Sequence, residues 1–258
     1  MDISSQRSRT RQFSFFSMRS QGVCSLFWML VCTANAFAEP VVFSAEYEAK
    51  AYGFSAVANR SLIKLSENRY SLRNTIAAEL FGESLAELDE RSEFLWQDGR
   101  VIPQSYSYIQ SGVSKSVEEV EFDWENNIAF STEDDKSWRI PIELGVLDKL
   151  AYQLQIRELI KQAAEPEFHF RVLDTDEIDA HHYRIVGEEV LETNLGRLNT
   201  VRVEKVRRDS DSRSTVIWLA TDWDYLLVGL EQINGSGRTV ELFLLRATVD
   251  GEVVSPLR

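Results

Sequence analysis

Residues 43–50 read FSAEYEAK, and this short stretch decides the fold class. Hydrophobic residues such as Phe43 and Tyr47 occupy every second position, and polar residues such as Glu46 occupy the positions between them. A period of two is the pattern of a β-strand with one face buried and the other in water. The stretch EVEFDWE at 119–125 has the same pattern. Strands of this kind are typical of an antiparallel sheet.

The same pattern extends outward over most of the chain. Alternating or apolar segments bounded by turn residues predict further strands at 61–66, 70–76, 91–96, 101–110, 137–142, 168–173, 181–187, 198–207, 214–220, 226–233 and 239–249. No regular alternation of strand and helix favours a parallel, doubly wound sheet.

Residues 146–163 have a helical pattern instead. Apolar residues recur there at three-to-four spacing, and Pro166 follows, which predicts one long amphipathic helix. A weaker helical pattern covers residues 77–88, which could equally form an irregular crossover. The predicted fold class is mainly β (α+β), a curved antiparallel sheet or open half-barrel with one long covering helix.

The N-terminal segment differs from the rest. Four arginines at positions 7, 9, 11 and 19 precede an apolar core from Val23 to Cys32, and Ala36-Phe37-Ala38 follows. This is the pattern of a secretory signal peptide, and its apolar core is shorter than the roughly 20 residues that span a bilayer. We expect cleavage after Ala38, a periplasmic location and no transmembrane segment in the mature chain. Translation could begin at Met1 or at Met18.

The predicted domain organisation follows from these patterns. It comprises a signal peptide at 1–38 and a single mainly-β domain at 39–258, with early strands at 41–142, the helix at 146–163 and late strands at 167–250. Length alone allows one domain or two small ones. We find no internal repeat and no linker rich in glycine or serine.

Composition excludes several classes of function. The 258 residues have a formal net charge of −13, and both cysteines, Cys24 and Cys32, lie in the predicted signal peptide. A mature chain without cysteine has no disulfide framework, no thiolate metal site and no cysteine nucleophile. A strongly acidic chain repels phosphates, so we expect no nucleic-acid partner.

The chain also lacks the parts of common catalytic and metal sites. It contains no Gly-x-Ser-x-Gly, no P-loop and no His-Glu-x-x-His motif. Neighbouring strand residues such as His181 and His182 point to opposite faces, so the two cannot bind one metal together. His169 could neighbour one of them across a ladder, but zinc needs a third and a fourth ligand. We therefore predict no enzyme activity, catalytic residue, metal site or cofactor.

Between residues 43 and 249 the chain resembles a family of bacterial exported proteins, domain of unknown function 3108. The matching stretches are Phe43–Glu48, Leu147–Leu150 with Gln153-Leu154, Glu192–Leu198 leading into Val201–Glu204, and Thr215–Ala220 before Tyr225-Leu226. The family name implies no activity.

A weaker similarity involves the turn from Thr221 to Asp224, between a strand that ends near Trp218 and one that begins at Tyr225. This arrangement is similar to periplasmic lipoprotein-localisation carriers. The similarity implies an open antiparallel half-barrel whose helices cover an apolar cavity. Those carriers usually have proline shortly after the turn, where this chain has Leu227-Val228.

The strands predicted between 214 and 249 are apolar on both faces, unlike the early strands. Part of the second face could line a pocket for an acyl chain or another apolar ligand. Alternatively, the helix packs on one face and the curved sheet closes over the other, leaving no pocket. The predicted lining residues are Trp218, Leu226, Val228, Leu230 and Phe243.

These observations favour a non-enzymatic periplasmic binding or carrier-like protein for an apolar ligand or a lipidated segment. The alternative is a ligand-free interaction module of envelope assembly, with a solid core. A continuous apolar pocket of several hundred Å³ would favour the carrier, because ligand sites have that size. The oligomeric state does not follow from the sequence.

Overall fold

The structure is a computed structural model that describes residues 38–51, 53–80, 83–112, 114–162, 165–206 and 213–257. The chain divides into two units, Met1–Asn35 and Ala36–Arg258, and every described residue belongs to the second unit. The predicted signal peptide therefore lies outside the described residues, apart from Ala38 at its end. The fold is that of the second unit.

Strands dominate the fold, as the alternating pattern predicts. The described residues form sixteen strands, one α-helix and one 3₁₀ turn: β1 (Phe43–Ala51), β2 (Phe54–Lys64), β3 (Arg69–Leu80), β4 (Glu83–Gln97), β5 (Arg100–Gly112), β6 (Ser116–Asp123), β7 (Ile128–Glu133), β8 (Lys136–Pro141), β9 (Val146–Leu147), α1 (Ala151–Lys161), β10 (Glu167–Asp174), β11 (Glu177–Thr193), β12 (Gly196–Lys205), β13 (Ser214–Ala220), η1 (Thr221–Trp223), β14 (Leu226–Ile233), β15 (Thr239–Val249) and β16 (Glu252–Val253).

All sixteen strands belong to one sheet, with the order β8-β7-β6-β5-β4-β3-β2-β1-β15-β14-β13-β12-β11-β10-β9 and with β16 on β15. Phe43 of β1 pairs with Val249 of β15, and this pairing joins the early strands to the late ones. Neighbours are antiparallel except for β9 and β10, which run parallel. The prediction of a mainly-β fold with an antiparallel sheet is confirmed.

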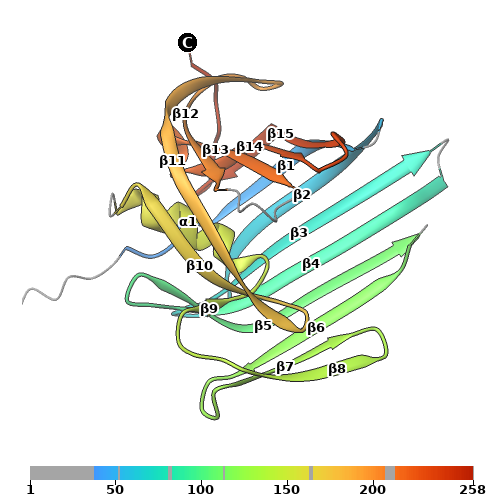
Figure 1. Cartoon of the computed structure of the whole chain (residues 1–258). Helices are drawn as coiled ribbons and strands as arrows, with labels where there is room; N and C mark the ends of the chain where they lie inside the picture. The colour runs from blue at the N-terminus through green and yellow to red at the C-terminus, as the bar shows by residue number, and fades with distance from the viewer. Residues whose placement is uncertain are drawn as a thin grey trace, which may run out of the picture. The chain divides into compact units, whose positions relative to one another are not determined.

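The sheet curls but does not close, and its late edge returns to the early strands (Figure 1). β9 contacts β5, and Thr175, after β10, donates a hydrogen bond of 3.4 Å to the buried side chain of Glu118 on β6. The late edge thus lies inside the curl of the early part. Sixteen strands are more than the predicted half-barrel needs, because the early part of the sheet continues through β7 and β8 beyond the strands that the late edge contacts.

The predicted helix at 146–163 is too long. Val146 and Leu147 form β9 and pair with Arg171 and Val172 of β10. The helix begins only at Ala151, because the side chain of Asp148 accepts hydrogen bonds from the backbone of Leu150 and Ala151. Such a contact satisfies backbone N–H groups that a helix start leaves unpaired. No helix among the described residues has the length and apolarity of a membrane span.

The weaker helical prediction at 77–88 is wrong. β3 continues to Leu80 and β4 starts at Glu83, with Ala77 opposite Glu87 and Ala78 opposite Ala86. β2 pairs with β3 as far as Ala77. Pairing with β2 therefore continues β3 beyond residues 70–76, where the alternating pattern predicts a strand. Tertiary pairing outweighs a weak local pattern in this hairpin.

The core fills the concave side of the sheet. Its largest fully buried side chains are aromatic, and they come from β1, β3, β4 and β5: Tyr47, Tyr70, Phe94 and Tyr106. Helix α1 lies in the same interior and buries seven of its eleven residues. The apolar positions of the early strands therefore face inward, as their alternation predicts.

Candidate functional site

Helix α1 is fixed inside the sheet by polar side chains as well as by packing. At its start Asp148 is 1% exposed, and the hydroxyl of Ser92 on β4 donates a hydrogen bond of 2.6 Å to its second oxygen. Burial raises the pKa of Asp148 to about 6. Desolvation disfavours the ionised carboxylate, and the three hydrogen bonds only partly offset it.

Two glutamines of α1 form hydrogen bonds with different parts of the early sheet. Gln155 accepts a hydrogen bond from the backbone N–H of Val101 at 2.8 Å and donates to the carbonyl of Gly99 at 3.3 Å. Gln153 accepts a hydrogen bond of 2.6 Å from Arg60 on β2. The helix is therefore tied to both β2 and the β4–β5 turn.

Arg60 is a buried cation whose hydrogen-bond partner is a neutral amide. It is 8% exposed, and burial lowers the pKa of its guanidinium group. Among the described residues no carboxylate forms an ion pair with it, and its one hydrogen-bond partner is Gln153. In contrast, Arg157 of α1 pairs with Asp224 and donates to the carbonyl of Val41. Burying an arginine without a counter-charge is costly.

The space beside Arg60 is a small cavity of about 50 Å³, a volume far below that of ordinary ligand sites. α1 and the concave face of the late strands supply most of its walls, and its lining includes Arg60, Tyr152, Ile156, Tyr183, Ile217, Leu219, Leu227 and Leu230. Leu230 is thus the one of the five predicted lining residues that lines this cavity.

Trp218 and Phe243 lie on the other face of the sheet. Their rings are 6.3 Å apart, next to Gly229, and the side chain of Leu191 covers them. Leu191 belongs to the hairpin β11–β12, whose tip crosses this face until Asn194 donates a hydrogen bond of 2.9 Å to Glu48 on β1. The second apolar face of the late strands is therefore covered by a hairpin.

The other two predicted lining residues, Leu226 and Val228, are fully buried in β14. Neither contributes to the lining of the cavity beside Arg60. The structure thus brings Trp218 and Phe243 together but separates them from Leu230. The prediction that these residues bind a ligand remains a prediction.

A larger hollow, open to the surface, lies where the curled sheet meets itself. It has a volume of about 530 Å³ and lies between the β4–β5 turn, β9, β10 and α1. We call it the seam groove. Six apolar residues line it, namely Val101, Ile102, Leu144, Leu147, Leu159 and Phe170, together with Gln97, Asp98, Arg100, Gly145, Gln155 and His169.

The seam itself carries a charged cluster. Lys149, two residues before the start of α1, forms ion pairs with Glu118 of β6 and, at 3.1 Å, with Asp174 of β10. Its ammonium group also lies 5.6 Å and 5.9 Å from the ring centres of Tyr106 and Tyr108. Lys149 thus holds the late edge of the sheet against the concave face of the early strands.

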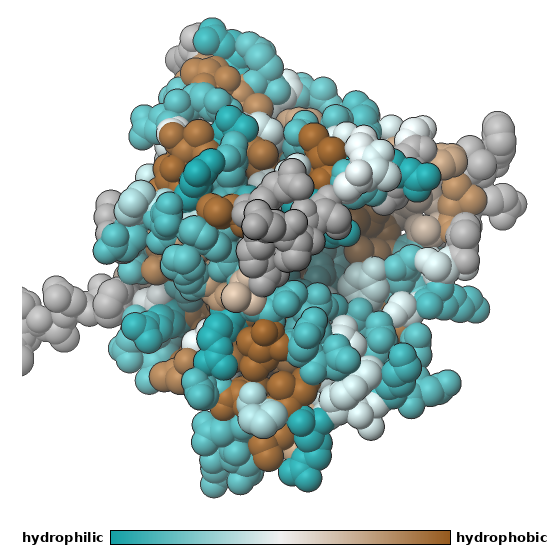
Figure 2. Space-filling model, in the orientation of Figure 1, coloured by the Kyte–Doolittle hydropathy of each residue, from teal (hydrophilic) through white to brown (hydrophobic). Residues whose placement is uncertain are grey.

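Hydrophobic residues are also visible at the surface of the protein. Figure 2 shows one face with scattered hydrophobic residues and a central hollow in which hydrophobic atoms are visible. Apolar side chains that are strongly exposed include Leu144, at 69%, which is one of the residues of the seam groove.

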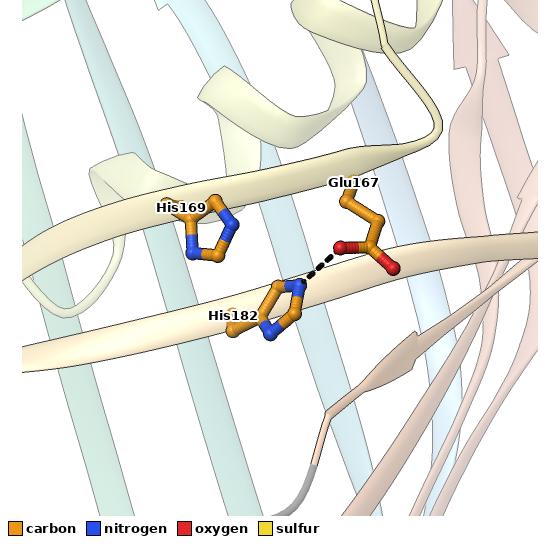
Figure 3. A group of neighbouring side chains, drawn as sticks. All are labelled: Glu167, His169 and His182. Atoms are coloured by element: carbon orange, nitrogen blue, oxygen red, sulfur yellow. Dashed lines mark hydrogen bonds and ion pairs between the residues drawn. The ribbon is translucent and has the colours of Figure 1, made fainter.

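The histidines form a second cluster, on β10 and β11. His169 and His182 are directly opposite each other across the ladder, with ring centres 4.1 Å apart. Glu167 lies on the same side, and its carboxylate is 3.0 Å from Nε2 of His182 (Figure 3). The expected proximity of His169 to one of the paired histidines is present, while the sequence analysis missed Glu167 as their neighbour.

Sequence reasoning also missed Arg60, Lys149 and Gln153. One signal was available: Ala58, Arg60 and Leu62 alternate along a strand, so a cation occupies a position whose neighbours on the same face are apolar. The stretch Leu147–Leu150 with Gln153-Leu154, on which the family resemblance partly rests, contains Asp148, Lys149 and Gln153. These residues start α1 and anchor it in the sheet.

Comparison with known proteins supports the family. The family model described as "Protein of unknown function (DUF3108)" matches residues 46–242. No curated protein matches the chain. The crystal structure of a beta-barrel-like protein of domain of unknown function DUF1849 from Brucella abortus is similar, with a TM-score of 0.55 and 10% identity over 82% of this chain and 99% of that one. At that identity the likeness concerns the fold alone.

Proposed function

Since the chain belongs to the DUF3108 family of proteins of unknown function, whose description assigns no activity, we propose a function from its geometry. The protein is a carrier-like binding protein that holds one apolar chain, such as the acyl chain of a lipid or of a lipidated segment, and does no covalent chemistry. The seam groove carries this proposal. Its volume of about 530 Å³ lies in the range of ligand sites, and apolar residues form half of its lining.

The seam groove is favoured over the interior because of size. The cavity beside Arg60 has about 50 Å³, and α1 buries seven of its eleven residues on the same side of the sheet. An acyl chain fits there only if α1 leaves. In the seam groove, Leu144 and Ile102 are already accessible, so a chain can bind without opening the core.

A fluorescent fatty acid tests the proposal directly. We expect saturable uptake by the wild-type chain, and lipid that co-purifies and is detected by native mass spectrometry. Leu144→Glu and Leu159→Glu each place a carboxylate in the seam groove and should weaken uptake at least about tenfold, the cost of about 1.4 kcal/mol. Ile63→Glu, at a residue of β2 that is 51% exposed outside the groove, is the matched control and should leave uptake unchanged.

The filled interior favours a second function. A sheet that packs a solid core around α1 is what a ligand-free interaction module of envelope assembly requires. The same measurements separate the two. Absence of both co-purifying lipid and saturable uptake in the wild-type chain would contradict the carrier and leave the module.

We also propose that the chain is exported to the periplasm and cleaved after Ala38. Two contacts support a start at Glu39, because its carboxylate accepts hydrogen bonds from Lys64 at 2.5 Å and from Tyr70 at 2.9 Å. A new N-terminus there would be fixed to the sheet. Sequencing the N-terminus of protein from the envelope fraction should give Glu39, and a chain that still begins in the arginine-containing leader contradicts cleavage.

A further inference from the structure

The inference concerns the cluster of Glu167, His169 and His182, and it does not depend on the proposed function. β10 and β11 are antiparallel, and His169 and His182 are paired in their register. Paired residues in a sheet point to the same face, and so does a residue two positions away, here Glu167. Figure 3 shows the three side chains gathered on one side of the two strands.

The distances between the three donor groups are close to those of ligands around one ion. One donor atom from each of Glu167, His169 and His182 lies within 4.8 Å of the other two. Nε2 of His182 is 3.0 Å from a carboxylate oxygen of Glu167. Zn²⁺ binds imidazole nitrogen and carboxylate oxygen at about 2.0–2.2 Å, so its ligand atoms lie about 3–3.5 Å apart. To bind one ion, the side chains have to rotate until all three donors lie in that range.

The neighbouring cations have carboxylates of their own. Arg184 is paired in register with Glu167, but its guanidinium contacts Glu204 at 3.3 Å. Arg171, two residues after His169, pairs with Glu143 at 2.8 Å. Among the described residues neither arginine forms an ion pair with Glu167, so that carboxylate remains accessible to a cation, with its side chain 52% exposed.

We propose that Glu167, His169 and His182 bind one divalent transition-metal ion of the Zn²⁺ class. Two imidazoles and one carboxylate are a ligand set that zinc uses where a fourth position stays open to water or to an external ligand. The rigid ladder between β10 and β11 holds the ligands in place without the metal. Because His169 also lines the seam groove, the ion lies at the edge of that groove.

The test is metal binding by a tag-free full chain in which Cys24→Ser and Cys32→Ser remove competing thiols. Titration calorimetry with Zn²⁺, together with metal analysis after dialysis, should give one bound ion per chain. His169→Ala and His182→Ala should each weaken binding at least about tenfold, and the double variant should abolish it. His181→Gln is the matched control, because the neighbouring histidine points to the other face, and it should bind as the parent chain does.

Spectroscopy distinguishes this site from weak binding to surface carboxylates. With Cu²⁺ in place of Zn²⁺, electron paramagnetic resonance should show hyperfine coupling to two imidazole nitrogens, and to one in either alanine variant. Circular dichroism should show that each variant keeps its strands. The proposal is overturned if the parent chain binds no stoichiometric ion, or if the folded double variant binds as the parent chain does.

Discussion

Asp148 is the residue at which burial and hydrogen bonding oppose each other most clearly. Its pKa is raised from 3.8 to about 6 by burial, although Ser92, Leu150 and Ala151 all donate to its carboxylate. A group with a raised folded pKa stabilises the fold below its unfolded pKa, and this contribution is lost as the pH rises through the folded pKa. Ionised Asp148 therefore opposes folding above about pH 6.

Asp148→Asn should remove this pH dependence. The amide oxygen can still accept from Leu150 and Ala151, and the amide can donate to Ser92, so the helix start is kept. Between pH 4 and pH 7.5 the unfolding free energy of the variant should rise relative to wild type, by at most about 3 kcal/mol. Urea unfolding at the two pH values measures the difference, and an equal difference at both would contradict the assignment.

Arg60 allows a paired prediction, because its buried guanidinium forms no direct ion pair among the described residues and donates to Gln153. Arg60→Met replaces the cation with an apolar side chain of similar length and should leave the unfolding free energy unchanged or raise it by about 1 kcal/mol. Gln153→Leu removes the one partner and leaves the cation, so it should lower stability by about 1–3 kcal/mol. If both variants lower the unfolding free energy equally, the guanidinium of Arg60 is stabilised by contacts other than Gln153, and the prediction is wrong.

At the scale of elements, the hairpin β11–β12 explains why the late strands are apolar on both faces. A side chain added at Gly229 would meet Leu191 at 2.9 Å, Trp218 at 3.0 Å and Phe243 at 3.2 Å. Gly229→Ala should therefore lower the unfolding free energy by about 1–3 kcal/mol. Leu191→Ala in the same chain should recover part of that loss in a double-mutant cycle, and strict additivity would exclude this contact.

Single elements also show which features of the fold can be predicted from local sequence patterns. The alternation in β1 and β6 depends only on neighbouring residues, so the strands and the class of fold were predictable. Alternation separates Ile217 from Trp218 but does not say which of them faces inward. Leu191 decides this, and it comes from a hairpin tip more than twenty residues earlier in the chain. The lining of any pocket was therefore beyond local patterns.

At the scale of the whole sheet, local sequence patterns again do not predict which distant elements come into contact. The proximity of His169 to His182 was predictable, because they fall on neighbouring predicted strands, but the sequence analysis expected no metal site there, and Glu167 required the register of β10 and β11. The open seam was not predictable, since it rests on contacts such as that of Lys149 with Glu118, which lie on elements far apart in the sequence.

The seam should open when its charged cluster is weakened. Glu118 and Lys149 expose only 12% and 24% of their side chains, so solvent screens their ion pair less than a surface pair. Glu118→Gln should lower the unfolding free energy by about 1–3 kcal/mol and should speed hydrogen exchange in β9 and β10. Arg73→Gln is the control, because its ion pair with Asp89 is exposed and should contribute under about 1 kcal/mol. If hydrogen exchange became equally faster in β1–β4, Glu118 would stabilise the whole sheet. That result would contradict the prediction that the seam opens separately.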